Sequence, residues 1–231
     1  MSSPDPHTAP HFATSALVTI DVQRDFLSEA PYGVPGTSEI LPALRETAAA
    51  FRAAGRPVIH VVRLYEEGGS NADLVRRRLL QSGVRIAAPG TSGSALAEGL
   101  APEGAPELDP GLLLSGAAQR LGPSEWAVFK PRWGAFYRTC LEELLRESGV
   151  DTVVFAGCNL PNCPRASIIE ASERDFRVAL VTDAVSRTTS SALAELAGIG
   201  VALMATGDLE GHLTAAAQAP EPGDDGEPAR S

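Results

Sequence analysis

The sequence predicts a three-layer α/β/α fold, in which helices cover both faces of a parallel β-sheet. Apolar, β-branched runs alternate with segments of helical period from Ala16 onward, and this alternation is typical of strands joined by helical crossovers. The chain has 231 residues, of which 44% are hydrophobic, which is enough for one domain with a substantial core. We therefore expect one domain over residues 14–212, with six strands.

Six segments are predicted to be strands because each is a short run rich in β-branched and other apolar residues. The first, ALVTID, ends at Asp21, and the second, PVIHVVRLY, begins at Pro57. The predicted ranges are, in chain order, 16–21, 57–65, 125–130, 152–156, 177–185 and 201–206.

Five segments with apolar residues at helical spacing predict the helices. Gly55 and Pro57 close the first helix and Gly149 closes the third, because glycine and proline are typical of helix ends. The predicted ranges are, in chain order, 38–54, 71–81, 139–148, 164–175 and 190–197. Residues 82–123 are rich in Gly, Pro and Ala, and we interpret them as an insertion or loop region.

Both ends of the chain are predicted to be disordered, over residues 1–13 and 213–231. The second of these segments becomes rich in Pro, Gly and acidic residues. A segment with so little apolar content cannot bury enough surface to offset the entropy of ordering. We therefore expect no structure in this acidic tail.

The formal net charge of −10 predicts that nucleic acids and anionic membrane surfaces are not partners. The N-terminus has no apolar core of signal-peptide length, and no later run approaches the roughly 20 apolar residues of a membrane span. The chain has an odd number of cysteines, Cys140, Cys158 and Cys163, and is large enough to be stable without disulfides. We expect free thiols and a reducing, cytoplasmic location.

Three reactive side chains follow predicted strands. Asp21 closes the first strand, Lys130 closes the third, and Cys163 follows the fourth after a short turn. Ligands of open parallel sheets bind beyond the carboxyl ends of the strands, where strand order reverses. The sequence therefore places all three on the ligand-binding edge.

Cys163 precedes Pro164, which is favoured at the first helical position, so we expect Cys163 at the helix cap. Unpaired backbone N–H groups there stabilise a thiolate. A carboxylate and an ammonium group can supply the base and the charge that this nucleophile needs. The four histidines, at positions 7, 11, 60 and 212, lie where no Cys–His pair is expected.

Each of these residues also has a structural interpretation. An Asp after a strand is often a turn or cap residue, and a Cys among apolar residues is usually a small core side chain. We interpret Cys140 and Cys158 as structural. The spacing of Cys158 and Cys163 matches no tight zinc pair, and no second pair completes a site.

The segments ALVTIDVQRDF and VFKPRWGAFYRTCLEELLRESGVDTVVFAGCNLPNCPRASIIEASERDFRVALVTDAVS resemble isochorismatase-like cysteine hydrolases. The resemblance covers residues 16–65 and 125–204. This superfamily includes nicotinamidases, N-carbamoylsarcosine amidohydrolases and isochorismatases. The resemblance implies a sheet of order 3-2-1-4-5-6, a small-molecule substrate, and a homodimer or homotetramer.

The resemblance also implies the role of each site residue. Asp21 is the general base and later acid, Lys130 holds and polarises the pair, and Cys163 attacks a carbonyl to form an acyl-thioester. The oxyanion hole is the backbone N–H groups of Asn159 and Cys163, next to a cis Cys158–Asn159 peptide bond. Removing one such donor typically costs about 3 kcal/mol of transition-state stabilisation.

The sequence departs from nicotinamidases after the second strand. Nicotinamidases carry an Asp and histidines there that bind a metal, whereas VVRLYEEGGSNADLVRRR has no histidine. We therefore expect no metal and no cofactor, and nicotinamide is a poor substrate hypothesis. The turn GCNLPNCPR also differs from the commoner pattern, which indicates a subgroup with its own substrate.

Several side chains are candidates for binding that substrate. Aromatic residues that closely follow Lys130 could stack on a planar group, although such residues are more often core. Arginines could bind a carboxylate through a bidentate fork, although most are solvated. The candidates are Trp133, Phe136, Tyr137, Arg76, Arg77 and Arg165.

The leading hypothesis is hydrolysis of a C–N bond in a small amide, carbamoyl or lactam group. The alternatives are vinyl-ether hydrolysis of the isochorismatase type, which needs no thiol nucleophile, and a non-catalytic scaffold of the same fold. A further alternative is redox sensing, in which Cys158 and Cys163 form a disulfide.

Overall fold

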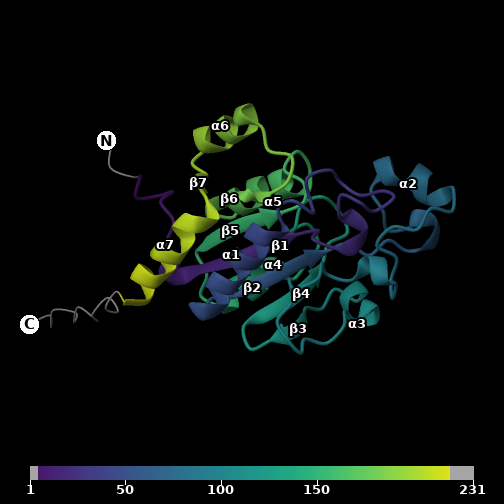
Figure 1. Cartoon of the computed structure of the whole chain (residues 1–231), viewed down its shortest axis with the longest axis horizontal. Helices are drawn as coiled ribbons and strands as arrows, with labels where there is room; N and C mark the ends of the chain where they lie inside the picture. Colours follow the sequence, from purple (N-terminus) through teal and green to yellow (C-terminus); the bar gives the residue numbers. More distant parts are fainter. Residues whose placement is uncertain (1–4, 219–231) are drawn as a thin grey trace, which may run out of the picture.

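A computed structural model describes residues 5–218, and these form one α/β/α domain (Figure 1). Seven strands make a single sheet. They are β1 (Ser15–Ile20), β2 (Val58–Val62), β3 (Gln119–Gly122), β4 (Glu125–Phe129), β5 (Thr152–Gly157), β6 (Arg177–Val185) and β7 (Ala202–Met204). The helices are α1 (Leu41–Ala53), α2 (Leu74–Gln81), α3 (Pro110–Leu114), α4 (Leu141–Glu147), α5 (Cys163–Ser172), α6 (Ser190–Gly198) and α7 (Thr206–Gln218).

The strand order is β3-β4-β2-β1-β5-β6-β7, and every pair is parallel except β3 with β4. The six parallel strands are the six predicted ones in the predicted order, so the expected fold is confirmed. The structure adds β3, an antiparallel edge strand within residues 82–123. Its sequence, QRLG, has one large apolar residue and therefore carries no strand pattern.

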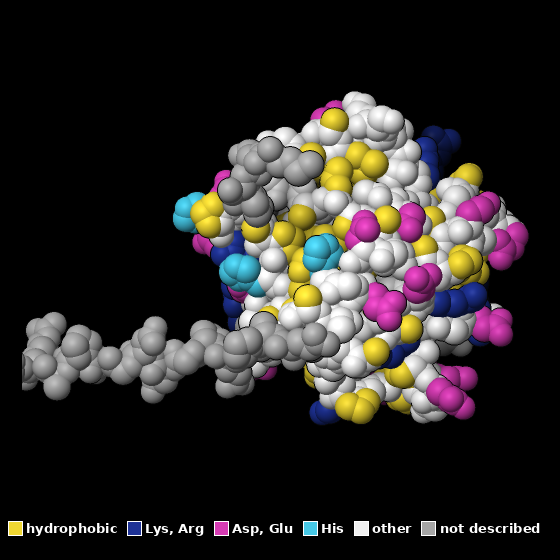
Figure 2. All heavy atoms as spheres, turned by 60° about the vertical axis from the view of Figure 1, so that its left-hand side comes forward, with side chains coloured by type: hydrophobic (Ala, Val, Ile, Leu, Met, Phe, Trp, Pro, Cys, Tyr) yellow, Lys and Arg dark blue, Asp and Glu magenta, His cyan; other side chains and the backbone are white. Residues whose placement is uncertain are grey.

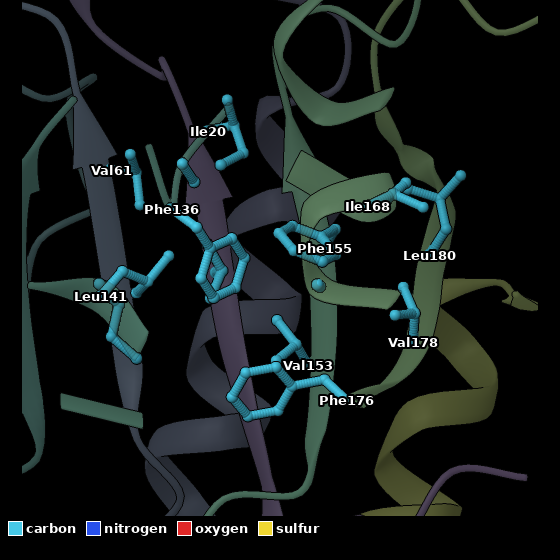
Figure 3. Packing of buried hydrophobic residues seen from close by; sticks show 14 of the residues in the cluster. Ile20, Val61, Phe136, Leu141, Val153, Phe155, Ile168, Phe176, Val178 and Leu180 are labelled. Carbon is cyan, nitrogen blue, oxygen red and sulfur yellow. The ribbon is translucent and has the colours of Figure 1, made fainter. Parts of the chain in front are cut away.

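Alternate residues of the strands face two hydrophobic cores. Ala16, Val18 and Ile20 of β1 pack against residues of α4, α5 and α6 on one face (Figure 3). Leu17 packs on the other face, with residues of α1 and α7. All six residues of β1 are buried, as expected for a central strand of a parallel sheet.

Residues 82–123 are part of the domain rather than a separate insertion. Leu96, Leu100, Leu113 and Leu121 belong to the core under α1 and α7. The apolar pieces of this segment are thus core residues, but their irregular spacing has no helical or strand period. A segment with such spacing cannot be recognised from the sequence as part of the core.

The chain ends are more ordered than the sequence predicts within the described residues. The backbone N–H of His11 donates to Thr152, and the Arg177 guanidinium donates to the carbonyl of Pro6. At the other end, α7 continues to residue 218 and buries Leu213. Long-range contacts therefore hold parts of both segments beyond the predicted domain bounds at 13 and 212; residues 1–4 and 219–231 lie outside the described residues.

Within residues 5–218, no helix is both long and apolar enough to cross a membrane. On the face that Figure 2 shows, apolar, acidic and uncharged side chains are interspersed. Lys and Arg side chains lie mainly at the margins of this face and form no continuous patch across it. Helices α7 and α2 lie at opposite ends of the molecule (Figure 1).

Candidate active site

The carboxyl ends of β4, β2, β1 and β5 lie side by side and bring the site together. Ile20 of β1 is in register with Val61 of β2 and Gly157 of β5, and Val62 of β2 with Phe129 of β4. The residues that follow these strands therefore meet at one edge of the sheet. This shared edge carries Asp21, Lys130 and the turn that leads to Cys163.

Asp21 and Lys130 form a buried ion pair. The Nζ atom of Lys130 lies 2.8 Å from Oδ2 of Asp21, and neither residue is more than 4% exposed. Asp21 has a φ of 53°, a left-handed conformation that aspartate tolerates better than most residues. Its second oxygen, Oδ1, is buried without a hydrogen-bond partner among the described residues. This oxygen is thus free to accept a proton.

Cys163 is the first residue of α5, and Asn162 is the cap. The helix therefore begins one residue earlier than expected, so Cys163 lies in its first turn rather than at the cap. Burial and the negative charge of Asp21 raise the pKa of the Cys163 thiol to about 12, although Lys130 and Arg63 act in the opposite direction. This direction of shift disfavours the expected thiolate and favours the neutral thiol near pH 7, because desolvation outweighs the helix terminus.

The turn between β5 and α5 contains a cis Cys158–Asn159 peptide bond, which confirms that prediction. Within residues 5–218, the backbone N–H groups of Asn159 and Cys163 donate to no acceptor. Both residues line the same small cavity as Asp21. Two unpaired N–H donors in one cavity with a cysteine thiol are the arrangement that an oxyanion hole would require.

Gly157, at the end of β5, is required by close packing against β1. Its φ of 118° lies in the left-handed region, and a Cβ atom there would overlap the backbone of Ile20. Only glycine fits both constraints. Gly157 thus lets the cysteine turn start close to the end of the strand that carries Asp21.

The cavity has a volume of about 30 Å³, and that is room for about one or two water molecules. Of the residues expected to bind substrate, Trp133 and Arg76 line it. Phe136, Tyr137, Arg77 and Arg165 are not among its lining residues.

Other contacts account for these four side chains. Phe136 is buried among Ile20, Leu141 and Phe155 (Figure 3), so packing explains it. Tyr137 is exposed beside Arg138. Arg165 pairs with Glu195 at 2.5 Å, and Arg77 donates to the carbonyl of Ala72.

The thiols of Cys158 and Cys163 line one cavity, and neither is in a disulfide. Burial raises the pKa of the Cys158 thiol to about 11, although Thr37 donates a hydrogen bond to its sulfur. Because thiol–disulfide exchange needs a thiolate, these high pKa values disfavour the redox hypothesis. Within residues 5–218, no group of three or more His, Cys, Asp or Glu side chains is placed to hold a metal ion.

Comparison with known proteins identifies the family. The Isochorismatase domain family matches residues 15–208, which are most of the chain. The chain belongs to the isochorismatase family. The expected superfamily and enzyme class, hydrolase, are therefore confirmed.

Relatives within the isochorismatase family differ in their reported activities. A protein of Arabidopsis thaliana named as a probable inactive nicotinamidase is 32% identical over 78% of this chain and 85% of its own length. A ureidoacrylate amidohydrolase of Methylobacterium radiotolerans is 28% identical over 78% of this chain and 70% of its own. Family membership therefore does not by itself identify the substrate.

A solved isochorismatase family structure from Desulfovibrio vulgaris has a TM-score of 0.74 and 32% identity, and the match covers 87% of this chain and 98% of that one. The N-carbamoylsarcosine amidase of Thermoplasma acidophilum has a TM-score of 0.65 and 22% identity, over 84% and 96% of the two chains, which shows a shared fold.

Sequence analysis of this isochorismatase family member missed several cavity residues, of which Arg63 is the most notable. It directly follows β2, and it is 2% exposed. A signal for it was present, because β2 ends at the same edge as β1 and β4. The strand was predicted to extend to residue 65, however, so Arg63 was assigned to the interior of the strand and not to its carboxyl end. The other missed lining residues are Phe26, Val34, Tyr65, Cys158 and Asn162.

Proposed function

We propose that this protein hydrolyses a C–N bond of a small amide, carbamoyl or lactam group through an acyl-thioester on Cys163. The observation that carries the proposal is the free Oδ1 atom of Asp21, in an ion pair with Lys130 and in the same cavity as the thiol. This carboxylate is the only strong base that lines the cavity among the described residues. It therefore takes the role that histidine has in other cysteine hydrolases.

The first half-reaction forms the thioester. Asp21 accepts the thiol proton as Sγ attacks the carbonyl carbon, so a free thiolate with its high pKa never accumulates. The oxyanion accepts hydrogen bonds from the backbone N–H groups of Asn159 and Cys163. When the C–N bond breaks, Asp21 returns the proton to the leaving nitrogen, which departs as ammonia or an amine, or stays on the ring-opened chain as an amine when the substrate is a lactam.

The second half-reaction consumes water. Asp21 removes a proton from a water molecule as its oxygen attacks the thioester carbonyl, and the C–S bond then breaks. The proton moves from Asp21 to the departing sulfur, which restores the neutral thiol. Lys130 pairs with the Asp21 carboxylate each time Asp21 has given up its proton, and this buried pairing offsets the desolvation of the carboxylate.

Named relatives support a C–N bond as the target. The ureidoacrylate amidohydrolase is one, and a maleamate amidohydrolase of Pseudomonas putida is 43% identical over 61 residues, or 26% of this chain. The name of the Arabidopsis relative favours a second candidate, a non-catalytic protein of the same fold. Vinyl-ether hydrolysis stays a further alternative. A homodimer or homotetramer also stays a prediction.

The test is a screen for ammonia release from small amides, ureides and lactams with the wild-type protein and Cys163→Ala. We expect turnover by the wild type, none by Cys163→Ala, and a mass increase on Cys163 when the reaction is quenched early. Cys140→Ala is the matched control and should keep full activity, because Cys140 lies at the start of α4, outside the cavity. Full turnover by Cys163→Ala would point to vinyl-ether chemistry. No turnover on any substrate, with slow alkylation of Cys163, would favour the non-catalytic candidate.

A further inference from the structure

We propose that Arg63 and Arg76 form a carboxylate-binding subsite in the catalytic cavity, so that the substrate is a small amide or ureide that carries a carboxylate. The inference that the bound carboxylate belongs to a substrate rests on the proposed function, but the subsite itself can be tested without turnover. Both residues line the cavity that Asp21 and Cys163 also line.

Arg63 is a buried cation with an unused donor. Its NH2 group lies 2.6 Å from Asp73, and its NH1 group reaches the carbonyl of Lys130 at 3.5 Å, a long contact. The Nε–H group is buried and has no acceptor among the described residues. A buried donor without an acceptor is unfavourable, because it has lost its hydrogen bonds to water. A ligand oxygen in the cavity would remove this cost.

The position of Arg63 is held from both ends of the residue. The Gln23 side chain accepts a hydrogen bond from the Arg63 backbone N–H at 2.7 Å and donates one to its carbonyl at 2.8 Å. At the other end, Asp73 holds the guanidinium, whose central carbon lies 5.3 Å from the centre of the Tyr65 ring. Rigid donors bind an anion with little loss of conformational entropy.

The charges at the cavity leave one positive charge uncompensated. Asp21 pairs with Lys130 and Asp73 pairs with Arg63. Arg76, on α2, is half-buried, and within residues 5–218 it has no ion-pair partner. Because the Cys163 thiol is neutral, the site has a net positive charge in a chain of net charge −10. This favours an anionic ligand over a neutral one.

The geometry of the donors favours a carboxylate. The free Nε–H of Arg63 can serve one oxygen and the Arg76 guanidinium the other, with charge-assisted hydrogen bonds. Trp133 lines the cavity and is 41% exposed, so it lies at the opening and borders any part of the substrate that extends outward.

The test compares alkylation of Cys163 by iodoacetate and iodoacetamide, two reagents of similar size of which only iodoacetate carries a carboxylate. Both react with the same thiolate, so the ratio of their rates is independent of the thiol pKa. We expect Arg63→Met to lower the iodoacetate-to-iodoacetamide ratio at Cys163 by about tenfold or more, and Arg76→Met to lower it in the same direction. Cys140, which lies outside the cavity, is the internal reference, measured by mass spectrometry on the full chain.

The matched control is Arg165→Met, which removes an exposed arginine outside the cavity and should leave the ratio unchanged. A folded Arg63→Met that slows both reagents equally would overturn the proposal, because Arg63 would then affect only the thiol. If Arg63→Met does not fold, a protection experiment on the wild-type protein tests the proposal instead. Malonate should protect Cys163 from iodoacetamide and neutral malonamide at the same concentration should not; equal protection would overturn the proposal.

The outcomes separate this subsite from the proposed function. A carboxylate preference in alkylation without hydrolysis of any amide would keep the subsite and reject the hydrolase mechanism. Conversely, Cys163-dependent hydrolysis with the same kcat/KM for acidic and neutral amides would keep the mechanism and reject the subsite.

Discussion

Lys130 reaches Asp21 across the end of β2, the strand that lies between theirs, and pairs with it at 2.8 Å. The residue that follows β2 is Arg63: its guanidinium contacts the Lys130 carbonyl, and its backbone is held by Gln23, two residues after Asp21. One acidic and two basic side chains thus follow three adjacent strands. This arrangement leads to four predictions.

Removing one partner of the buried pair destabilises the fold. Lys130→Gln leaves the Asp21 carboxylate buried without a counter-charge, so we expect the free energy of unfolding to fall by about 3–5 kcal/mol, measured by urea denaturation. The double variant Asp21→Asn/Lys130→Gln should recover part of this loss, because neither residue is then charged. Arg165→Gln, which breaks an exposed pair, should leave stability unchanged. Additive losses in the double variant would contradict the prediction.

Asp21→Asn should lower turnover and yet speed alkylation of the nucleophile. The variant lacks the base, so kcat/KM should fall by about 10²–10⁴-fold. It also lacks the negative charge that raises the pKa of Cys163, so more thiolate is present at pH 8 and iodoacetamide should react faster. Cys140, outside the cavity, should react at its wild-type rate in the same samples. Slower alkylation of Cys163 in the variant would show that Asp21 favours the thiolate instead.

The buried thiol predicts loss of stability at alkaline pH. Burial and Asp21 raise the pKa of Cys163 to about 12 in the folded state, against about 8.5 when unfolded. The resulting stabilisation is fully present below about pH 8.5 and is lost as the pH rises towards 12. Between pH 9 and 10.5 the wild type should lose about 1.4 kcal/mol more per pH unit than Cys163→Ala, in urea titrations. Parallel curves for the two proteins would contradict this.

Gly157→Ala should destabilise the protein and disturb the cysteine turn. The new Cβ atom would overlap the Ile20 backbone, at a φ of 118° that side chains rarely adopt. We expect a loss of more than about 2 kcal/mol in unfolding free energy. Gly211→Ala in α7 is the matched control, because nothing lies within 4 Å of its Cβ position. It should be neutral or slightly stabilising. Equal unfolding free energies for the two variants would contradict the prediction, because β1 and β5 would then accommodate the new Cβ atom without loss of stability.

The missed elements share a physical cause. Strand β3 is held by pairing with β4, and α7 by the packing of Leu209 and Leu213 on the core under α1. Neither has a strong periodic pattern of its own, because partners far away in the sequence supply the stabilisation. Phe136 follows the same rule: its spacing from Lys130 suited the cavity equally well, and only the packing of Ile20, Leu141 and Phe155 places it in the core.

The sequence by itself determined the α/β fold, its six parallel strands and the edge that carries Asp21, Lys130 and Cys163, and its resemblance to isochorismatase-like hydrolases implied the strand order. Local periodicity marks each strand, and parallel strands necessarily end at a common edge. Only the tertiary structure decided that the thiol is neutral, that Arg63 lies beside the ion pair, and that Trp133 and Arg76 line the cavity while Phe136, Tyr137 and Arg165 do not. These properties depend on burial and on contacts between distant residues, and neither is encoded in the spacing of side chains along the chain.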